Sequence, residues 1–67
     1  MHICESVRAC RLAANLTQRQ VAESLSVAPA AVAQWESGVK VPTTRNLMAL
    51  ADLYRVSLDK LTGRNTS

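Results

Sequence analysis

One stretch of the sequence decides the fold, the segment LTQRQVAESLSVAPAAVAQWESG at residues 16–38. Thr17 followed three positions later by Gln20 forms a capping box, which is typical of the first turn of a helix. Pro29 suits the start of a further helix, because its missing N–H would be unpaired there, and Gly38 suits the end of that helix. The segment therefore predicts two short helices joined by a tight turn, the second of them at residues 29–37.

Apolar residues before this segment recur at the three- and four-residue spacing of an amphipathic helix. The stripe consists of Ile3, Val7, Cys10 and Ala14. It predicts a helix at residues 2–14, and Asn15 is suited to a left-handed helix end.

Two more helices are expected after the segment. Thr43 or Thr44 caps the first of them, and Ser57 caps a short final helix that Gly63 ends. The inward side of the first carries Leu47, Leu50, Ala51 and Tyr54. No alternating apolar period indicates a strand, so the predicted fold class is all-α with five helices.

A chain of 67 residues has room for one domain, near the lower limit of what folds on a hydrophobic core alone. We expect that single domain at residues 1–67, with residues 64–67 as a disordered tail. The composition is 48% hydrophobic but only 3% aromatic, so the core must be mainly aliphatic. Trp35, the largest apolar side chain, should anchor its helix to that core.

The charge indicates an anionic partner, and the lack of a catalytic set of residues argues against an enzyme. A net charge of +3 modestly favours an anionic partner. The single histidine, His2, lies near the N-terminus, and no nucleophile–histidine set or facing pair of carboxylates can be assembled. We therefore predict no catalytic activity, no cofactor and no small-molecule site.

Cys4 and Cys10 are the only cysteines. On one helix they lie about 9 Å apart along the axis, which disfavours a disulfide and fits a reduced, cytoplasmic chain. With His2 they match no common zinc spacing, so no metal site is expected. No apolar run suggests a signal peptide or a membrane span.

The motifs of the deciding segment continue in one register along nearly the whole chain. They are Leu16-Thr17-Gln18, Val21-Ala22, Leu25, Val27, Val32, Trp35-Glu36, Gly38, Pro42, Leu47, Leu50-Ala51 and Val56-Ser57-Leu58-Asp59. This pattern resembles the helix-turn-helix domain of phage repressors, Cro proteins and their bacterial relatives. The resemblance implies a five-helix, lambda-repressor-like fold with the helix-turn-helix unit at about residues 17–38. It also implies a sequence-specific regulator of transcription, bacterial or phage-encoded and associated with the nucleoid. Such a regulator inserts the helix at 29–37 into the major groove of double-stranded DNA.

The resemblance also implies roles for individual residues. Phosphate contacts fall to Gln18, Arg19, Ala28, Lys40, Arg45 and Asn46, and base contacts to Gln34, Ala30, Pro29 and Ala33. Arg11 and Glu36 correspond to a mostly buried ion pair that joins the first helix to the end of the third.

Two features depart from the usual pattern of the family. Pro29, Ala30 and Ala31 stand where polar residues are usual, which leaves Gln34 as the amide able to bond adenine. We therefore expect sparse, A·T-leaning base readout with a larger share from DNA shape. Ser26 stands in the turn where Gly is frequent, at a cost of about 1 kcal/mol if its φ is positive.

A repressor acting as a homodimer on a palindromic operator is the leading hypothesis, with half-sites about 34 Å apart as for helix-turn-helix proteins in general. The predicted dimer contact involves Val56, Leu58, Leu61 and Arg64, although Leu58 or Leu61 could equally belong to the core. The alternative is a protein-interaction module, such as an antitoxin or a transcription-complex subunit, whose alanine-rich third helix docks on a partner protein.

Overall fold

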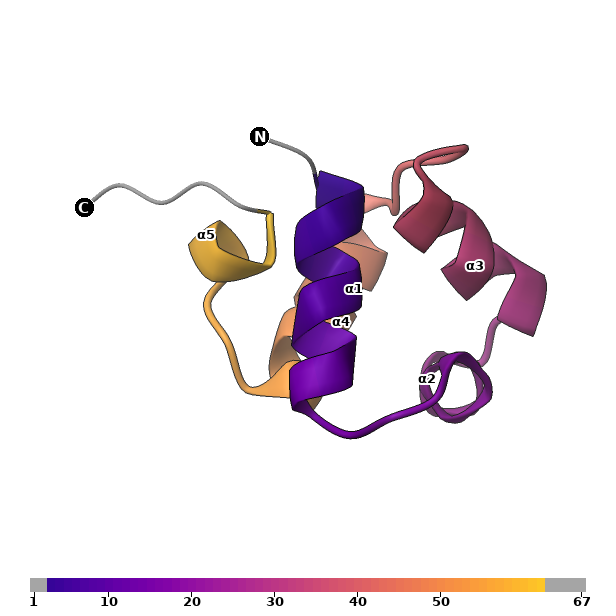
Figure 1. Ribbon diagram of the computed structural model, residues 1–67, viewed down its shortest axis with the longest axis horizontal. Helices are drawn as coiled ribbons and strands as arrows, with labels where there is room; N and C mark the ends of the chain where they lie inside the picture. The colour runs from indigo at the N-terminus through magenta and orange to yellow at the C-terminus, as the bar shows by residue number, and fades with distance from the viewer. Residues whose placement is uncertain (1–2, 63–67) are drawn as a thin grey trace.

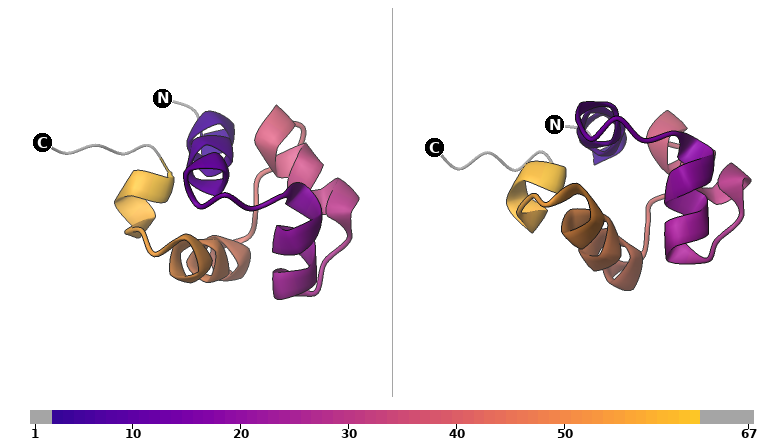
Figure 2. Two further views of the ribbon diagram at one scale, coloured as in Figure 1. Left: turned by 60° about the horizontal axis from the view of Figure 1, so that its bottom comes forward. Right: turned by 90° about the horizontal axis from the view of Figure 1, so that it is seen from below.

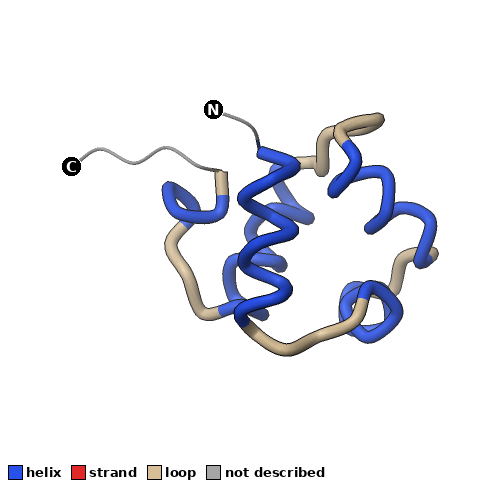
Figure 3. The backbone as a smooth tube through the Cα atoms, viewed as in Figure 1, coloured by secondary structure: helices blue, strands red, loops and turns tan. Residues whose placement is uncertain are grey.

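The computed structural model describes residues 3–62. In that part of the chain the helices are α1 (Ile3–Ala13), α2 (Gln18–Leu25), α3 (Pro29–Ser37), α4 (Thr44–Tyr54) and α5 (Leu58–Leu61). Helix α1 stands at the centre of Figure 1, with α2 and α3 on one side of it and α5 on the other. Helix α4 lies behind α1 in that view and below it in Figure 2. Only helices and loops occur within the described residues, which confirms the predicted all-α architecture (Figure 3).

Local capping bonds set the starts of α2, α4 and α5. The Thr17 hydroxyl accepts from the Gln20 N–H at 3.0 Å, and the Gln20 side chain accepts from the Thr17 N–H at 2.8 Å, so the predicted capping box is confirmed. Thr43, rather than Thr44, caps α4, and Ser57 caps α5 as predicted. Each such cap is worth about 1 kcal/mol.

The helix ends differ slightly from the prediction. Helix α1 ends at Ala13, one residue before the predicted end at residue 14, and residue 2 of the predicted range lies outside the described residues. Helix α5 ends at Leu61, where Thr62 caps it and its hydroxyl donates to the Leu58 carbonyl at 2.9 Å. The predicted end at Gly63 and the predicted tail at residues 64–67 lie outside the described residues.

Among residues 3–62, four residues have a positive φ in the left-handed region. Asn15 has a φ of 60° and Gly38 a φ of 85°, as their predicted places at helix ends require. Ser26 has a φ of 58°, so the condition for the expected cost of about 1 kcal/mol between α2 and α3 is met. Arg55, with a φ of 57°, ends α4 in the same conformation, which no sequence pattern predicted.

The core gathers side chains from every helix. Its buried apolar residues are Val7, Cys10, Val21, Ala22, Val32, Trp35, Leu50, Ala51, Tyr54 and Leu61. Ala22 and Val32 are almost completely buried, which lets the backbones of α2 and α3 approach each other closely. Trp35 is only 6% exposed, which confirms that it anchors α3 to the core.

Burial corrects one residue of the predicted dimer contact. Leu61 is 0% exposed, because α5 packs against α1 and α4 and turns this side chain inward. It therefore belongs to the core and is not available to a partner. Leu58 remains exposed on the same short helix, and Val56 is partly buried.

Among residues 3–62, none of the helices combines the length and hydropathy that a bilayer crossing requires. Cys4 and Cys10 are both free thiols, the first partly exposed and the second buried.

Candidate nucleic-acid interface

A buried ion pair joins α1 to the end of α3. Arg11 donates from Nε to Glu36 Oε2 at 2.7 Å and from Nη2 to Glu36 Oε1 at 3.0 Å, so the contact is bidentate. The two side chains are 11% and 3% exposed. This is the pair that the resemblance implies, and it raises the pKa of Arg11, mainly through the hydrogen bonds to Glu36. Removing one partner alone would leave a buried charge unpaired, at a cost of about 3–5 kcal/mol.

Arg11 also holds the loop that leads into α2. Its Nη1 donates to the Leu16 carbonyl at 2.8 Å. One guanidinium therefore fixes α1, the residue before the helix-turn-helix unit and the last turn of α3, which sets the position of that unit on the rest of the domain.

Gln18, the first residue of α2, joins this network. Its side-chain Nε2 donates to Glu36 Oε1 at 3.1 Å. The side chain is partly buried, at the helix N-terminus where backbone N–H groups give a partial positive charge. The bond to Glu36 is absent from the sequence-based expectations, because the two residues lie 18 positions apart across the turn.

The outer face of α3 carries small and largely apolar side chains. Pro29 and Ala30 are exposed, while Ala33 and Gln34 are partly buried. Within residues 3–62 the side-chain amide of Gln34 makes no hydrogen bond, although its backbone carbonyl accepts from Val39 at 3.0 Å. The four predicted base-contact residues thus lie on one helix.

One residue of that helix does not face outward as expected. Ala31 is partly buried and packs against the core. The departure from the family pattern on the exposed surface is therefore limited to Pro29 and Ala30.

The predicted phosphate-contact residues lie on four segments: the start of α2, the residue before α3, the loop after α3 and the start of α4. Ala28 caps α3 without a side-chain hydrogen bond, and Lys40 is exposed in the loop after that helix. Arg45 is exposed in the first turn of α4, where Asn46 is partly buried and donates its backbone N–H to Thr43.

Arg19, on α2, has a side chain that is 82% exposed and lies 3.7 Å from Glu23, a contact of little energetic weight in water. Helices α2, α3 and α4 carry no acidic residue in their first turns, so none of these turns contains a carboxylate that would repel a phosphate.

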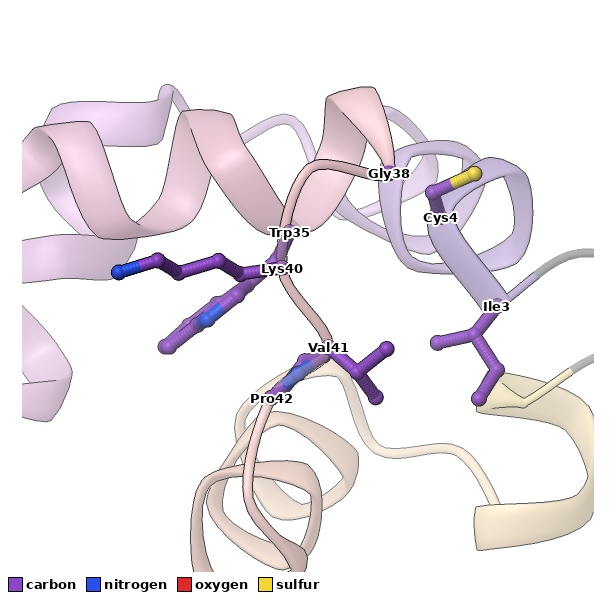
Figure 4. Close-up of a pocket in the computed structure, with 7 residues that line it drawn as sticks. All are labelled: Ile3, Cys4, Trp35, Gly38, Lys40, Val41 and Pro42. Atoms are coloured by element: carbon purple, nitrogen blue, oxygen red, sulfur yellow. The ribbon is translucent and has the colours of Figure 1, made fainter.

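A shallow pocket of about 250 Å³ lies between the start of α1 and the loop after α3. Its lining residues are Ile3, Cys4, Trp35, Gly38, Lys40, Val41 and Pro42. Figure 4 shows the Lys40 side chain pointing away from Ile3 and Cys4. Of the predicted contact residues, this pocket contains Lys40 alone, so it does not unite the site.

Burial creates one further unusual group, the Tyr54 hydroxyl of α4, which finds no hydrogen-bond partner among residues 3–62. Burial, followed by the Glu36 carboxylate, raises the pKa of Tyr54 to about 12. Burial also raises the pKa of the Cys10 thiol. The described residues contain no group of three or more His, Cys, Asp or Glu side chains that could hold a metal ion.

A family model described as helix-turn-helix matches residues 7–61. The chain therefore belongs to the helix-turn-helix family.

Its relatives are regulators of transcription. The chain is 38% identical over 64 residues to the cryptic phage CTXphi transcriptional repressor RstR of Vibrio cholerae, covering 96% of this chain and 57% of RstR. It is 36% identical over 61 residues to the HTH-type transcriptional activator BcrR of Enterococcus faecalis, covering 91% of this chain and 30% of BcrR. The chain thus spans only part of the length of these relatives.

Two solved structures share the fold. The P22 c2 repressor, crystallised in complex with a synthetic operator, superposes with a TM-score of 0.87 at 28% identity, covering 97% of this chain and 98% of that one. A transcriptional regulator from Listeria innocua gives a TM-score of 0.86 at 29% identity, covering 98% of this chain and 62% of that one.

Proposed function

We propose that this chain is a DNA-binding transcriptional regulator, acting as a repressor, that places α3 in the major groove of double-stranded DNA. The observation that carries the proposal is the uncovered outer face of α3, where Pro29 and Ala30 are exposed at the start of the helix. An α-helix fits the major groove only if its neighbours leave that face free. Membership of the helix-turn-helix family and the likeness to a repressor crystallised with its operator support the same function.

Base readout would be sparse. Gln34 carries the amide that can bond adenine bidentately, and its side chain makes no hydrogen bond within residues 3–62. Ala30, Ala33 and Pro29 offer apolar contact to thymine methyl groups without a hydrogen bond. A half-site rich in A·T pairs, read partly through its shape, fits this surface best.

Phosphates on either side of the groove would be held by the flanking segments. Lys40 and Arg45 bring positive charge, and both are exposed. Hydrogen-bond donors from side chains or backbone near the starts of α2, α3 and α4 would come from Gln18, Arg19, Ala28 and Asn46. The net charge of +3 is favourable for the same partner.

One such domain reads about half of an operator, so the proposal includes a homodimer on a palindrome with half-sites about 34 Å apart. The exposed Leu58 and the neighbouring Val56 are the described residues left for the dimer contact, while Arg64 lies outside the described residues. A cytoplasmic location at bacterial or phage DNA belongs to the same proposal.

Selection of bound sites from a random duplex pool, followed by binding at several salt concentrations, tests this function. We expect enrichment of an A·T-rich palindrome and an affinity that falls steeply as salt rises. If no duplex binding were detected even at low salt, the result would contradict DNA binding and favour the protein-interaction module.

A further inference from the structure

The Glu36 carboxylate receives three hydrogen bonds from two different elements. Arg11 of α1 supplies two of them, at 2.7 and 3.0 Å, and Gln18 of α2 supplies the third, at 3.1 Å. Because the Glu36 side chain is 3% exposed, water competes little for its oxygens. The ion pair is therefore also an anchor for a side chain at the proposed DNA surface.

The carboxylate also fixes the orientation of the Gln18 amide. An ionised carboxylate only accepts hydrogen bonds, so the amide must present Nε2 and not its oxygen to Glu36. One N–H of Nε2 is then used, and the second N–H of the same group stays available to an acceptor outside the network. A phosphate oxygen is such an acceptor.

We propose that Glu36, held by Arg11, is a positioning residue that fixes Gln18 for its contact with a DNA phosphate. This inference rests on the proposed function and deepens it. Glu36 does not touch DNA, because its side chain is almost fully buried. Glu36 acts on binding only by ordering Gln18. The Gln18 side chain already occupies one rotamer in the free protein, so it loses less conformational entropy on binding.

The effect on affinity follows from that saving. Immobilising a long, flexible side chain at an interface lowers affinity by roughly 2- to 10-fold. Loss of the anchor should therefore weaken binding by a factor in this range. Gln18 is uncharged, so the loss should be the same at every salt concentration, unlike the loss of a lysine contact.

A double-mutant cycle tests the proposal. The anchor is removed by Arg11→Met together with Glu36→Leu, which keeps the net charge constant and replaces a buried ion pair by apolar groups, a change that folds often tolerate. The other arm is Gln18→Ala, which leaves the Thr17–Gln20 capping box intact. Affinity is measured by fluorescence anisotropy on a random-sequence duplex at several salt concentrations, below the melting temperature of every variant.

We expect the anchor variant to lose roughly 2- to 10-fold more affinity when Gln18 is present than when Gln18 is already Ala. A core variant outside the hydrogen-bonded network, Leu50→Val, should lower the melting temperature without this pattern. Equal weakening in both backgrounds would overturn the proposal, as would an unchanged affinity of Gln18→Ala. Failure of the proposed function differs from both, since the unaltered protein would then not bind the duplex.

A measurement without substitutions covers the case in which the anchor variant does not fold. In NMR spectra of the free protein, the Gln18 side-chain amide protons should show contacts to the Glu36 side chain and a single χ1 rotamer. Averaging over several rotamers would overturn the proposal, because Gln18 would then not be fixed before binding.

Discussion

Replacing Tyr54 by Phe should make the domain more resistant to alkali. Tyr54 is 7% exposed and its hydroxyl makes no hydrogen bond among residues 3–62. At neutral pH, deletion of that hydroxyl removes an unsatisfied polar atom, so stability should stay unchanged or rise by up to about 1 kcal/mol.

The pH dependence has a definite sign. The pKa of Tyr54 rises from 10.0 to about 12 on folding, so the unfolded chain loses the phenolic proton first. The contribution of Tyr54 to stability is therefore complete below pH 10 and is lost as the pH rises toward 12. With these two pKa values the loss is about 1 kcal/mol at pH 11 and approaches about 3 kcal/mol above the folded pKa.

Urea unfolding of both proteins at pH 8 and pH 11 measures this loss. Burial raises the pKa of the Cys10 thiol as well, but that thiol is present in both proteins and cancels in the comparison. The Tyr54→Phe protein should gain about 1 kcal/mol of stability relative to the parent between the two pH values. Equal losses of stability in both proteins would refute the claim that burial raises the pKa of the Tyr54 hydroxyl.

Three further changes test the fold and the phosphate contacts. Ser26→Gly should raise the free energy of unfolding by about 0.5–1 kcal/mol, because the φ of Ser26 is 58°. The control Ser24→Gly, inside α2, should lower the free energy of unfolding by a similar amount. Equal effects of the two substitutions in urea titrations would contradict backbone strain at Ser26. Trp35→Ala should cost about 3–5 kcal/mol and unfold so small a domain, so a cooperative melt near the parent temperature would show that Trp35 is not core. Lys40→Ala should weaken binding to all duplexes alike and reduce the salt slope by about 1, and an unchanged slope would remove Lys40 as a phosphate contact.

Local signals explain why most helix boundaries could be predicted from the sequence. The Thr17–Gln20 capping box depends on residues three positions apart, and Pro29 and Gly38 determine backbone conformation by themselves. Such features need no knowledge of the rest of the fold. The left-handed Arg55 was missed because arginine carries no preference for that conformation.

The inward and outward sides of short segments could not be predicted in the same way. Leu58 and Leu61 are both apolar residues of a four-residue helix, and only the docking of α5 on α1 and α4 decides that Leu61 is buried. Ala31 was placed on the outer face of α3 for a similar reason, since alanine suits either side.

The family pattern gave the Arg11–Glu36 pair, but the bond from Gln18 to Glu36 depends on how α2 folds back on α3. No spacing along the chain encodes that contact.

The exposed start of α3 offers the most direct test of the central claim. Ala30→Glu places a negative charge where the helix would face the groove, and Ala9→Glu makes the same change at an exposed position of α1. Like charges at an interface repel strongly, so Ala30→Glu should weaken duplex binding by roughly tenfold or more, while Ala9→Glu should change it by roughly threefold at most. Equal affinities of two folded variants would contradict the placement of α3 in the major groove.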